Sequence, residues 1–171
     1  MVNDAGASPS ISYGKAERAS KKGEDAAAAV LPGDDAPAAF AIFDGHSGKQ
    51  TAQLCSETIC QRLVEKGPPF EPQGIKDMLW AVDEEIGTTE GVRDGATAQM
   101  LFVERVGDVL KGTFAWCGDS SAVLADMETG KVVFSTASHT AGPDHQNGGS
   151  WKEEKVMLEF FGEVRAHHRR R

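Results

Sequence analysis

The stretch from residue 38 to residue 48, Ala-Ala-Phe-Ala-Ile-Phe-Asp-Gly-His-Ser-Gly, constrains the fold of this chain most strongly. Its first six residues carry no charge and lie between Pro37 and a glycine, which is typical of a strand buried on both faces of a sheet. Such a strand presents Asp44, Gly45 and His46 at its rim, where a carboxylate is costly to bury unless a cation or hydrogen-bond donors meet it. We therefore place the chemistry at this point, although a plain polar turn is the alternative for the stretch taken alone.

The composition of the chain fits one globular domain of 171 residues, with 40% hydrophobic and 26% charged residues. Eighteen Lys and Arg against 26 Asp and Glu give a formal net charge of -8. This charge argues against a nucleic-acid-binding surface and fits a site that concentrates cations.

Three cysteines without C-x-x-C spacing indicate reduced thiols rather than a disulfide framework or a zinc knuckle. No apolar run approaches the roughly 18 residues that a membrane helix needs, and the N-terminus lacks the regions of a signal peptide. We expect no membrane association and a location in the cytosol or nucleus.

Strands are predicted on both sides of a helical block. Residues 11–18, 26–31 and 38–43 are predicted as three strands of a meander. From residue 95 the apolar pattern has a period of two, with even-numbered and odd-numbered positions on opposite faces. Strands are therefore predicted again over residues 96–103, 110–117, 121–126 and 131–135.

Two helices are predicted between these blocks. The first begins with a capping-box signature, Ser47 with Gln50, and ends before residues 67–69, Gly-Pro-Pro. The second covers residues 75–86, where apolar side chains recur at helical spacing, and Gly87 is expected to end it. A third helix is predicted from another capping box over residues 150–161.

The two ends of the chain differ from this pattern. Residues 1–10 are small and polar and are expected to form a flexible N-terminal arm. Residues 166–171 form a basic tail whose expected role is solvation. The intervening residues 11–165 are expected to form a single domain.

Three carboxylates are predicted to converge, because Glu24 and Asp25 start a strand next to the one that ends at Asp44. With the Gly45 carbonyl they form a set of hard oxygen donors, which select magnesium or manganese over zinc. Two such ions can generate a hydroxide that hydrolyses phosphate esters. His46 could protonate a departing alkoxide, and a lysine from residues 21–22 could hold the phosphate oxygens.

Four sequence blocks, at residues 13–25, 40–48, 94–98 and 118–124, occur in an order and approximate spacing that resembles the type 2C metal-dependent serine/threonine protein phosphatases. The resemblance covers roughly residues 12–165, and its first block looks most like the plant and green-algal branch. It implies an α+β fold, an α-β-β-α sandwich with two Mg²⁺ or Mn²⁺ ions between the sheets. It also implies that a metal-bridging hydroxide attacks phosphoserine or phosphothreonine in a phosphoprotein substrate.

The resemblance implies roles for individual positions. Asp44 matches the metal-bridging aspartate and Gly45 the backbone-carbonyl ligand. Glu24 matches the acidic position that binds metal through water, and Asp25 matches the acidic residue beside it. His46 matches the proposed general acid.

Two further positions complete this set. Asp119 resembles an aspartate associated with a third, weaker metal. Ser20 stands where the resemblance implies a phosphate-binding arginine, so that Lys21, Lys22 or Arg18 would have to substitute.

The resemblance is to the N-terminal portion of the catalytic domain, so the fold is expected to be truncated after its first half. The remaining half of the family's domain carries two further metal-binding aspartates, whereas residues 165–171 contain no acid. We therefore expect weak metal affinity and little or no turnover. The alternative is a catalytically inactive regulatory module that binds a protein partner at an exposed sheet edge. A simple magnesium-binding or basic-tail interaction protein is a third hypothesis.

Overall fold

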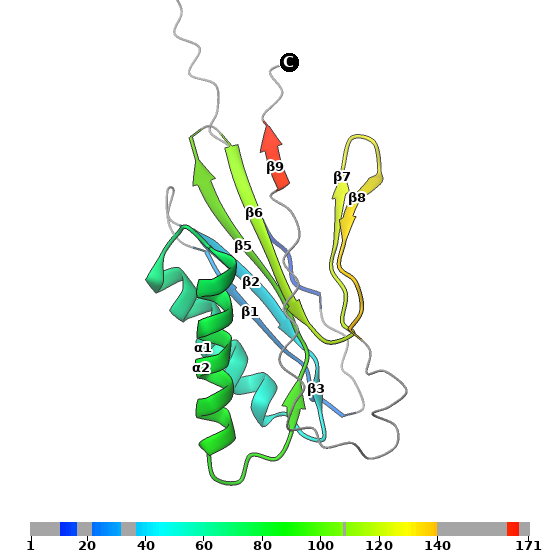
Figure 1. Cartoon of the computed structure of the whole chain (residues 1–171). Helices are drawn as coiled ribbons and strands as arrows, with labels where there is room; N and C mark the ends of the chain where they lie inside the picture. The colour runs from blue at the N-terminus through cyan, green and yellow to red at the C-terminus, as the bar shows by residue number, and fades with distance from the viewer. Residues whose placement is uncertain (1–10, 17–21, 32–36, 108, 140–163, 168–171) are drawn as a thin grey trace, which may run out of the picture.

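The computed structural model describes residues 11–16, 22–31, 37–107 and 109–139, and the backbone of residues 164–167. These residues form two helices and nine strands (Figure 1). The helices are α1 (Gln50–Lys66) and α2 (Pro72–Thr88). The strands are β1 (Ala26–Val30), β2 (Ala38–Phe43), β3 (Gly45–His46), β4 (Gly95–Ala96), β5 (Ala98–Val106), β6 (Val109–Cys117), β7 (Val123–Asp126), β8 (Lys131–Ser135) and β9 (Val164–His167).

The main sheet has five strands in the order β1-β2-β5-β6-β9, and every neighbouring pair is antiparallel. Strand β2 lies between β1 and β5, and one of its faces, with Ala39, Ala41 and Phe43, belongs to the core. The predicted burial on both faces is wrong at Ile42, which is 58% exposed. Two short ladders, β3-β4 and β7-β8, complete the strands. The predicted α+β class is therefore confirmed.

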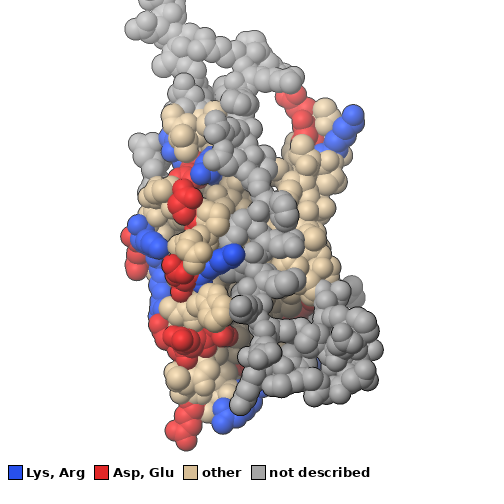
Figure 2. Space-filling view, viewed as in Figure 1, with Lys and Arg blue, Asp and Glu red and all other residues tan. Residues whose placement is uncertain are grey.

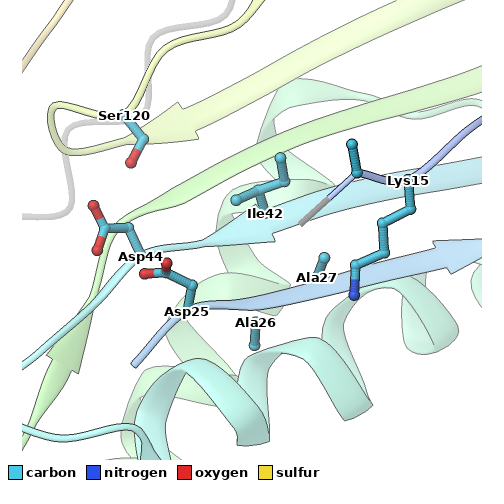
Figure 3. Close-up of a pocket in the computed structure, with 8 residues that line it drawn as sticks. Lys15, Asp25, Ala26, Ala27, Ile42, Asp44 and Ser120 are labelled. Atoms are coloured by element: carbon cyan, nitrogen blue, oxygen red, sulfur yellow. The ribbon is translucent and has the colours of Figure 1, made fainter. Parts of the chain in front are cut away.

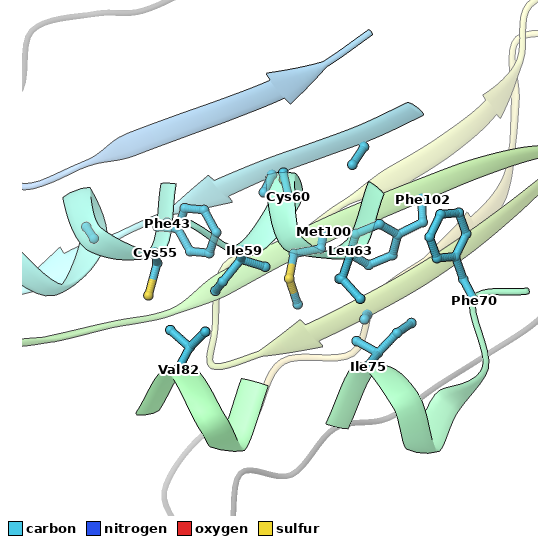
Figure 4. Packing of buried hydrophobic residues seen from close by; sticks show 14 residues of the cluster. Phe43, Cys55, Ile59, Cys60, Leu63, Phe70, Ile75, Val82, Met100 and Phe102 are labelled. Carbon is cyan, nitrogen blue, oxygen red and sulfur yellow. The ribbon is translucent and has the colours of Figure 1, made fainter. Parts of the chain in front are cut away.

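Both helices cover the same face of the main sheet (Figure 1). The buried positions of α1 recur at helical spacing, and those of α2 are Ile75 and Val82. They pack on alternate residues of the strands, namely Phe43, Met100 and Phe102 (Figure 4). This alternation confirms the predicted period of two along β5.

The opposite face of β6 carries aromatic side chains that contact the β7-β8 ladder. Phe114 and Phe134 have ring centroids 4.9 Å apart, and Trp116 lies 6.2 Å from Phe134 by the same measure. The Trp116 indole also donates a hydrogen bond to the Ala137 carbonyl and stacks on His139. The described residues thus form a helical layer, the main sheet and a hairpin on its second face.

Most predicted elements are confirmed, but three details of the N-terminal half were wrong. Residues 11–16 form no strand, so the predicted meander has two strands rather than three. Helix α1 begins at Gln50 after the N-cap Lys49, and no side chain of the predicted capping box caps it. Helix α2 continues through Gly87 to Thr88.

At the C-terminal end, strand β9 pairs with β6 and includes Ala166 and His167, which the sequence analysis assigned to a basic tail. The helix predicted over residues 150–161 and the flexible arm predicted over residues 1–10 lie outside the described residues. Within the described ranges, no helix is long and apolar enough to cross a membrane.

Candidate metal centre

The register of β1 and β2 places two carboxylates side by side. Ala26 pairs with Phe43, so the next positions outward on these antiparallel strands are Asp25 and Asp44. Both residues are exposed, and Figure 3 shows their carboxylates close together at the end of β2. The predicted convergence of Asp25 with Asp44 therefore results from strand pairing.

The surroundings of Asp44 raise the pKa of its carboxyl group. The largest cause is partial desolvation, followed by the negative charge of Asp25 and a side-chain hydrogen bond with Asp25. The charge of Asp119 raises the pKa further, whereas His46 lowers it. Like charges this close favour binding of a cation, which would relieve their repulsion.

Asp119 approaches from a different element, the bend that follows β6. Side chains of β5 hold this bend in place. The Thr97 and Ser120 hydroxyl oxygens are 2.6 Å apart in a hydrogen bond, and the Gln99 amide donates a hydrogen bond to the Ser120 carbonyl. Asp119 is therefore held near enough to the end of β2 to influence the pKa of Asp44.

Gly45 is buried where the chain leaves β2. A Cβ at this position would collide with the carbonyl oxygens of Glu24 and Gly48, both of which belong to the backbone. A glycine is therefore required for the close approach of these segments. The Glu24 side chain is 18% exposed, and its Oε2 lies 3.8 Å from the Lys22 ammonium.

His46 lies on β3 and pairs with Gly95 on β4. Its imidazole covers Gly95 so closely that a Cβ there would lie 2.5 Å from Nε2. His46 is exposed and near enough to Asp44 to influence its pKa. The next residue, Ser47, has a left-handed backbone with φ 64°.

The sequence analysis missed the role of Asp94. Its carboxylate accepts hydrogen bonds from the backbone N–H of Gln50 at 2.7 Å and of Thr51 at 3.0 Å, and from the Thr51 hydroxyl at 2.6 Å. Asp94 thus caps α1 from 43 or more positions away in the sequence. These hydrogen bonds lower the pKa of the Asp94 carboxyl group, with the Thr51 hydroxyl as the largest cause. The signal available in the sequence was a carboxylate in the block at residues 94–98.

The donor atoms present are oxygens, which are the type of ligand that magnesium and manganese ions prefer. Asp25 and Asp44 supply carboxylate oxygens, and such ions retain several waters in addition to protein ligands. Within the part of the chain that the structure describes, no three His, Cys, Asp or Glu side chains are close enough to hold a metal ion by themselves, so the predicted convergence of Glu24 with Asp25 and Asp44 is not seen. The described residues therefore provide a two-carboxylate centre, with Asp119 and His46 at its border.

A pocket of about 360 Å³ adjoins the two carboxylates (Figure 3). Asp25 and Asp44 line it together with Ser120, Ile42 and Lys15. The sequence analysis did not select Lys15 for this region.

The sequence analysis predicted that Lys21 or Lys22 binds phosphate. Lys22 is paired with Glu24 and is absent from the pocket lining. Lys21 lies outside the described residues.

Charged side chains of both signs are interspersed over the helical side of the molecule (Figure 2). An example is the bidentate ion pair of Arg62 with Glu85, which joins α1 to α2 with N–O distances of 2.8 and 2.7 Å. Such a surface is typical of a solvated helical layer.

Comparison with solved structures supports the fold. The structure of a sex-determining protein of C. elegans matches with a TM-score of 0.50 over 64% of this chain and 30% of that chain, at 22% identity. At this identity the match concerns the fold alone.

Curated relatives are protein phosphatases from animals and a plant. The chain is 30% identical to protein phosphatase 1B of Mus musculus over 142 residues, which are 68% of this chain and 34% of that protein. It is 34% identical to the probable protein phosphatase 1N of Homo sapiens, covering 60% of this chain and 24% of that protein. The probable protein phosphatase 2C 67 of Oryza sativa is 32% identical, covering 55% of this chain and 27% of that protein.

The chain thus spans about a quarter to a third of the length of these relatives. The family model of protein phosphatase 2C matches residues 10–145, which include all of the proposed metal-binding positions. The chain therefore belongs to the protein phosphatase 2C family.

Proposed function

We propose that this chain provides a metal centre for the hydrolysis of phosphoserine and phosphothreonine in proteins. The observation that carries the proposal is the position of Asp25 and Asp44 at the paired ends of β1 and β2, within hydrogen-bonding reach of each other. Membership of the protein phosphatase 2C family supports the reaction class.

Asp44 and Asp25 would bind Mg²⁺ or Mn²⁺ directly, with the Gly45 carbonyl and, through water, Glu24. The conformation at Gly45 supports this assignment, because it brings the backbones of Gly45 and Glu24 into contact. A bound pair of divalent ions supplies Lewis-acid chemistry that activates water and draws charge from phosphoryl oxygens. Asp119 would serve a weaker additional ion.

His46 would donate a proton to the departing serine or threonine oxygen. Its exposed imidazole beside Asp44 supports this role, since a positioned imidazole is a common general acid. Lys21 or Lys22 would hold phosphate oxygens. For Lys22, this role requires that its ammonium exchange the pairing with Glu24 for the substrate.

The test is calorimetric titration of the purified chain with Mn²⁺, beside the variant Asp44→Asn. We expect binding to the parent chain and at least a tenfold loss of affinity in the variant, because the substitution removes the negative charge of a carboxylate ligand to the divalent ion. Glu128→Gln is the matched control. It removes one carboxylate from the exposed turn between β7 and β8 and should leave the affinity unchanged.

Turnover is measured on a phosphoserine peptide with the same three proteins. Release of phosphate that depends on Mn²⁺ and is lost in Asp44→Asn would support the phosphatase. Equal Mn²⁺ binding by the parent chain and Asp44→Asn would overturn the metal assignment. Binding of Mn²⁺ without phosphate release would instead favour the partner-binding alternative.

A further inference from the structure

The bend that carries Asp119 is held by two residues that the proposed function does not use. Thr97 joins β4 to β5, and Gln99 lies two positions further along the chain, on β5. The Thr97 hydroxyl is hydrogen-bonded to the Ser120 hydroxyl at 2.6 Å, and the Gln99 amide donates a hydrogen bond to the Ser120 carbonyl. Ser120 is therefore held both at its side chain and at its backbone.

Thr97 also contacts the opposite side of the candidate metal centre. Its backbone N–H donates a hydrogen bond of 2.9 Å to the Asp44 carbonyl. On the bend, Gly118 packs so closely on Thr97 that a Cβ at Gly118 would lie 2.6 Å from the Thr97 methyl carbon. Thr97 therefore links the end of β2, which carries Asp44, to the bend that carries Asp119.

Gln99 lies on the sheet face that carries the pocket. Gln99 and Ile42 are register partners on β5 and β2, and directly paired residues of antiparallel strands share a face. Ile42 and Ser120 both line the pocket, and Figure 3 shows Ser120 near Asp44. The Gln99 amide thus reaches a wall of the pocket from the sheet below it.

Gln99 is an unfavourable residue for this position unless it has a task there. It is only 6% exposed, and its Oε1 is buried without a hydrogen-bond partner among the residues that the structure describes. Burying an unpaired amide oxygen costs free energy, whereas an apolar side chain of similar size would avoid that cost. Residues that break a packing rule in this way are expected at functional sites.

Other hydrogen bonds hold the two flanks of the bend. The His139 N–H donates to the Gly118 carbonyl at 2.9 Å. The Ala122 N–H donates to the Thr136 hydroxyl at 2.9 Å. Because these contacts lie on either side of Asp119, loss of the contacts from β5 would leave the flanks in place and release only the middle of the bend.

We propose that Thr97 and Gln99 are positioning residues of the candidate metal centre, which hold Ser120 so that the Asp119 carboxylate stays within reach of an ion bound at Asp44. Neither side chain would touch the ion itself. This inference rests on the proposed function, because it needs a divalent ion at Asp25 and Asp44.

The first test is calorimetric titration of the variant Gln99→Met with Mn²⁺, which does not depend on turnover. The variant should bind Mn²⁺ about tenfold more weakly than the parent chain, as is usual when a group that orients a metal ligand is lost. Urea unfolding should show equal stability, because loss of the hydrogen bond is offset by removal of the unpaired oxygen. Gln61→Met is the matched control: it removes an exposed amide that bonds Glu65 on α1 and should bind Mn²⁺ like the parent chain.

The second test separates the hydrogen bond of Thr97 from its packing. Thr97→Val keeps the shape of the side chain but removes the hydroxyl, so it should weaken Mn²⁺ binding about as much as Gln99→Met. Thr97→Ser keeps the hydroxyl and should bind Mn²⁺ like the parent chain, although loss of the methyl group should lower its stability. The affinity should therefore follow the contact with Ser120 and not the stability of the fold.

A double-mutant cycle tests whether the effect is transmitted through Asp119. Asp119→Asn should itself weaken Mn²⁺ binding, because it removes the charge of the carboxylate. Adding Gln99→Met to Asp119→Asn should then cause no further loss of affinity. A purely structural role of Gln99 would instead give the same loss with either residue at position 119.

The two proposals fail in different ways. Affinity like that of the parent chain in Gln99→Met and Thr97→Val would overturn the positioning role, and loss of binding in Asp44→Asn would leave the proposed function standing. A further loss when Gln99→Met is added to Asp119→Asn would also overturn the positioning role, as would unchanged binding in Asp119→Asn. Equal Mn²⁺ binding by the parent chain and Asp44→Asn would overturn the proposed function, and the positioning role with it.

Discussion

Gly45 shows how one residue controls the geometry of the candidate metal centre. The backbone carbonyl of Glu24 occupies the space that a side chain at Gly45 would need, and the Gly48 carbonyl limits it from another direction. Neither obstacle is a flexible side chain that could rotate away. The absence of a Cβ thus allows the start of β1 and the end of β2 to approach.

We predict that Gly45→Ala lowers the free energy of unfolding by about 1–3 kcal/mol, the usual cost of overpacking a close contact. It should also weaken Mn²⁺ binding, because the shifted backbone separates the carboxylates. Urea unfolding and calorimetry measure the two effects. Gly87→Ala is the control: it has open space around it within α2 and should raise stability by up to about 1 kcal/mol. A Gly45→Ala protein as stable as the parent would contradict the assigned contact.

The helix α1 is stabilised at its N-terminus by a residue that local sequence does not reveal. Asp94 precedes β4 and satisfies the backbone N–H groups of Gln50 and Thr51. The sequence pattern correctly predicted where the helix lies, because its apolar spacing is local. It predicted the wrong cap, since Ser47 lies outside the helix in a left-handed conformation and the true cap depends on tertiary packing.

We predict that Asp94→Ala lowers the free energy of unfolding by about 1–2 kcal/mol, the usual cost of losing an N-cap. Asp94→Asn should cost less, because the amide oxygen still accepts a hydrogen bond. Urea denaturation followed by circular dichroism measures both. The pKa of Asp94 is lowered in the folded chain, so its contribution is present above the unfolded pKa and is lost as the pH falls through the folded value. Equal stability of parent and Asp94→Ala would exclude a capping role.

At the same scale, strand prediction succeeded where alternate residues of the strand pack on the helices. It failed where strand pairing depends on contacts that the local sequence does not reveal. Strand β5 was predicted because its alternate residues face the helices. Residues 11–16 were also predicted to be part of a strand, but Tyr13 packs on Phe40 without forming a ladder. Strand β9 was missed because it has only four residues and leads into the basic end of the chain, although Val164 and Ala166 alternate with polar residues.

In the molecule as a whole, the site depends on contacts among segments far apart in the sequence. Asp25 and Asp44 could be predicted to converge because antiparallel neighbours bring their ends together. Lys15 could not, because its place depends on the packing of Tyr13 rather than on a strand. The residue types in the sequence therefore indicated a metal-binding site, whereas the pocket beside the two carboxylates was evident only from the folded structure.

The buried thiols of the helical layer give the whole molecule a dependence on alkaline pH. Burial raises the pKa of Cys60 to about 12 and is also the largest cause that raises the pKa of Cys55 to about 11. In the unfolded chain both thiols ionise near pH 9, so the folded state binds more protons between this pH and the folded pKa values. Stability should therefore fall as the pH rises above about 9, by up to about 1.4 kcal/mol per pH unit for each thiol.

Urea unfolding of the parent chain and of the variant Cys55→Ala/Cys60→Ala, between pH 7 and pH 10.5, measures this dependence. The variant should be less stable at pH 7, because two buried side chains are shortened in the core. Its stability should nevertheless fall less steeply above pH 9 than that of the parent. The slope, and not the absolute stability, identifies the thiols as the cause, because lysine and tyrosine titration is common to both proteins. Parallel pH profiles would show that both thiols ionise as readily in the folded chain as in the unfolded one, which would contradict their burial against the sheet.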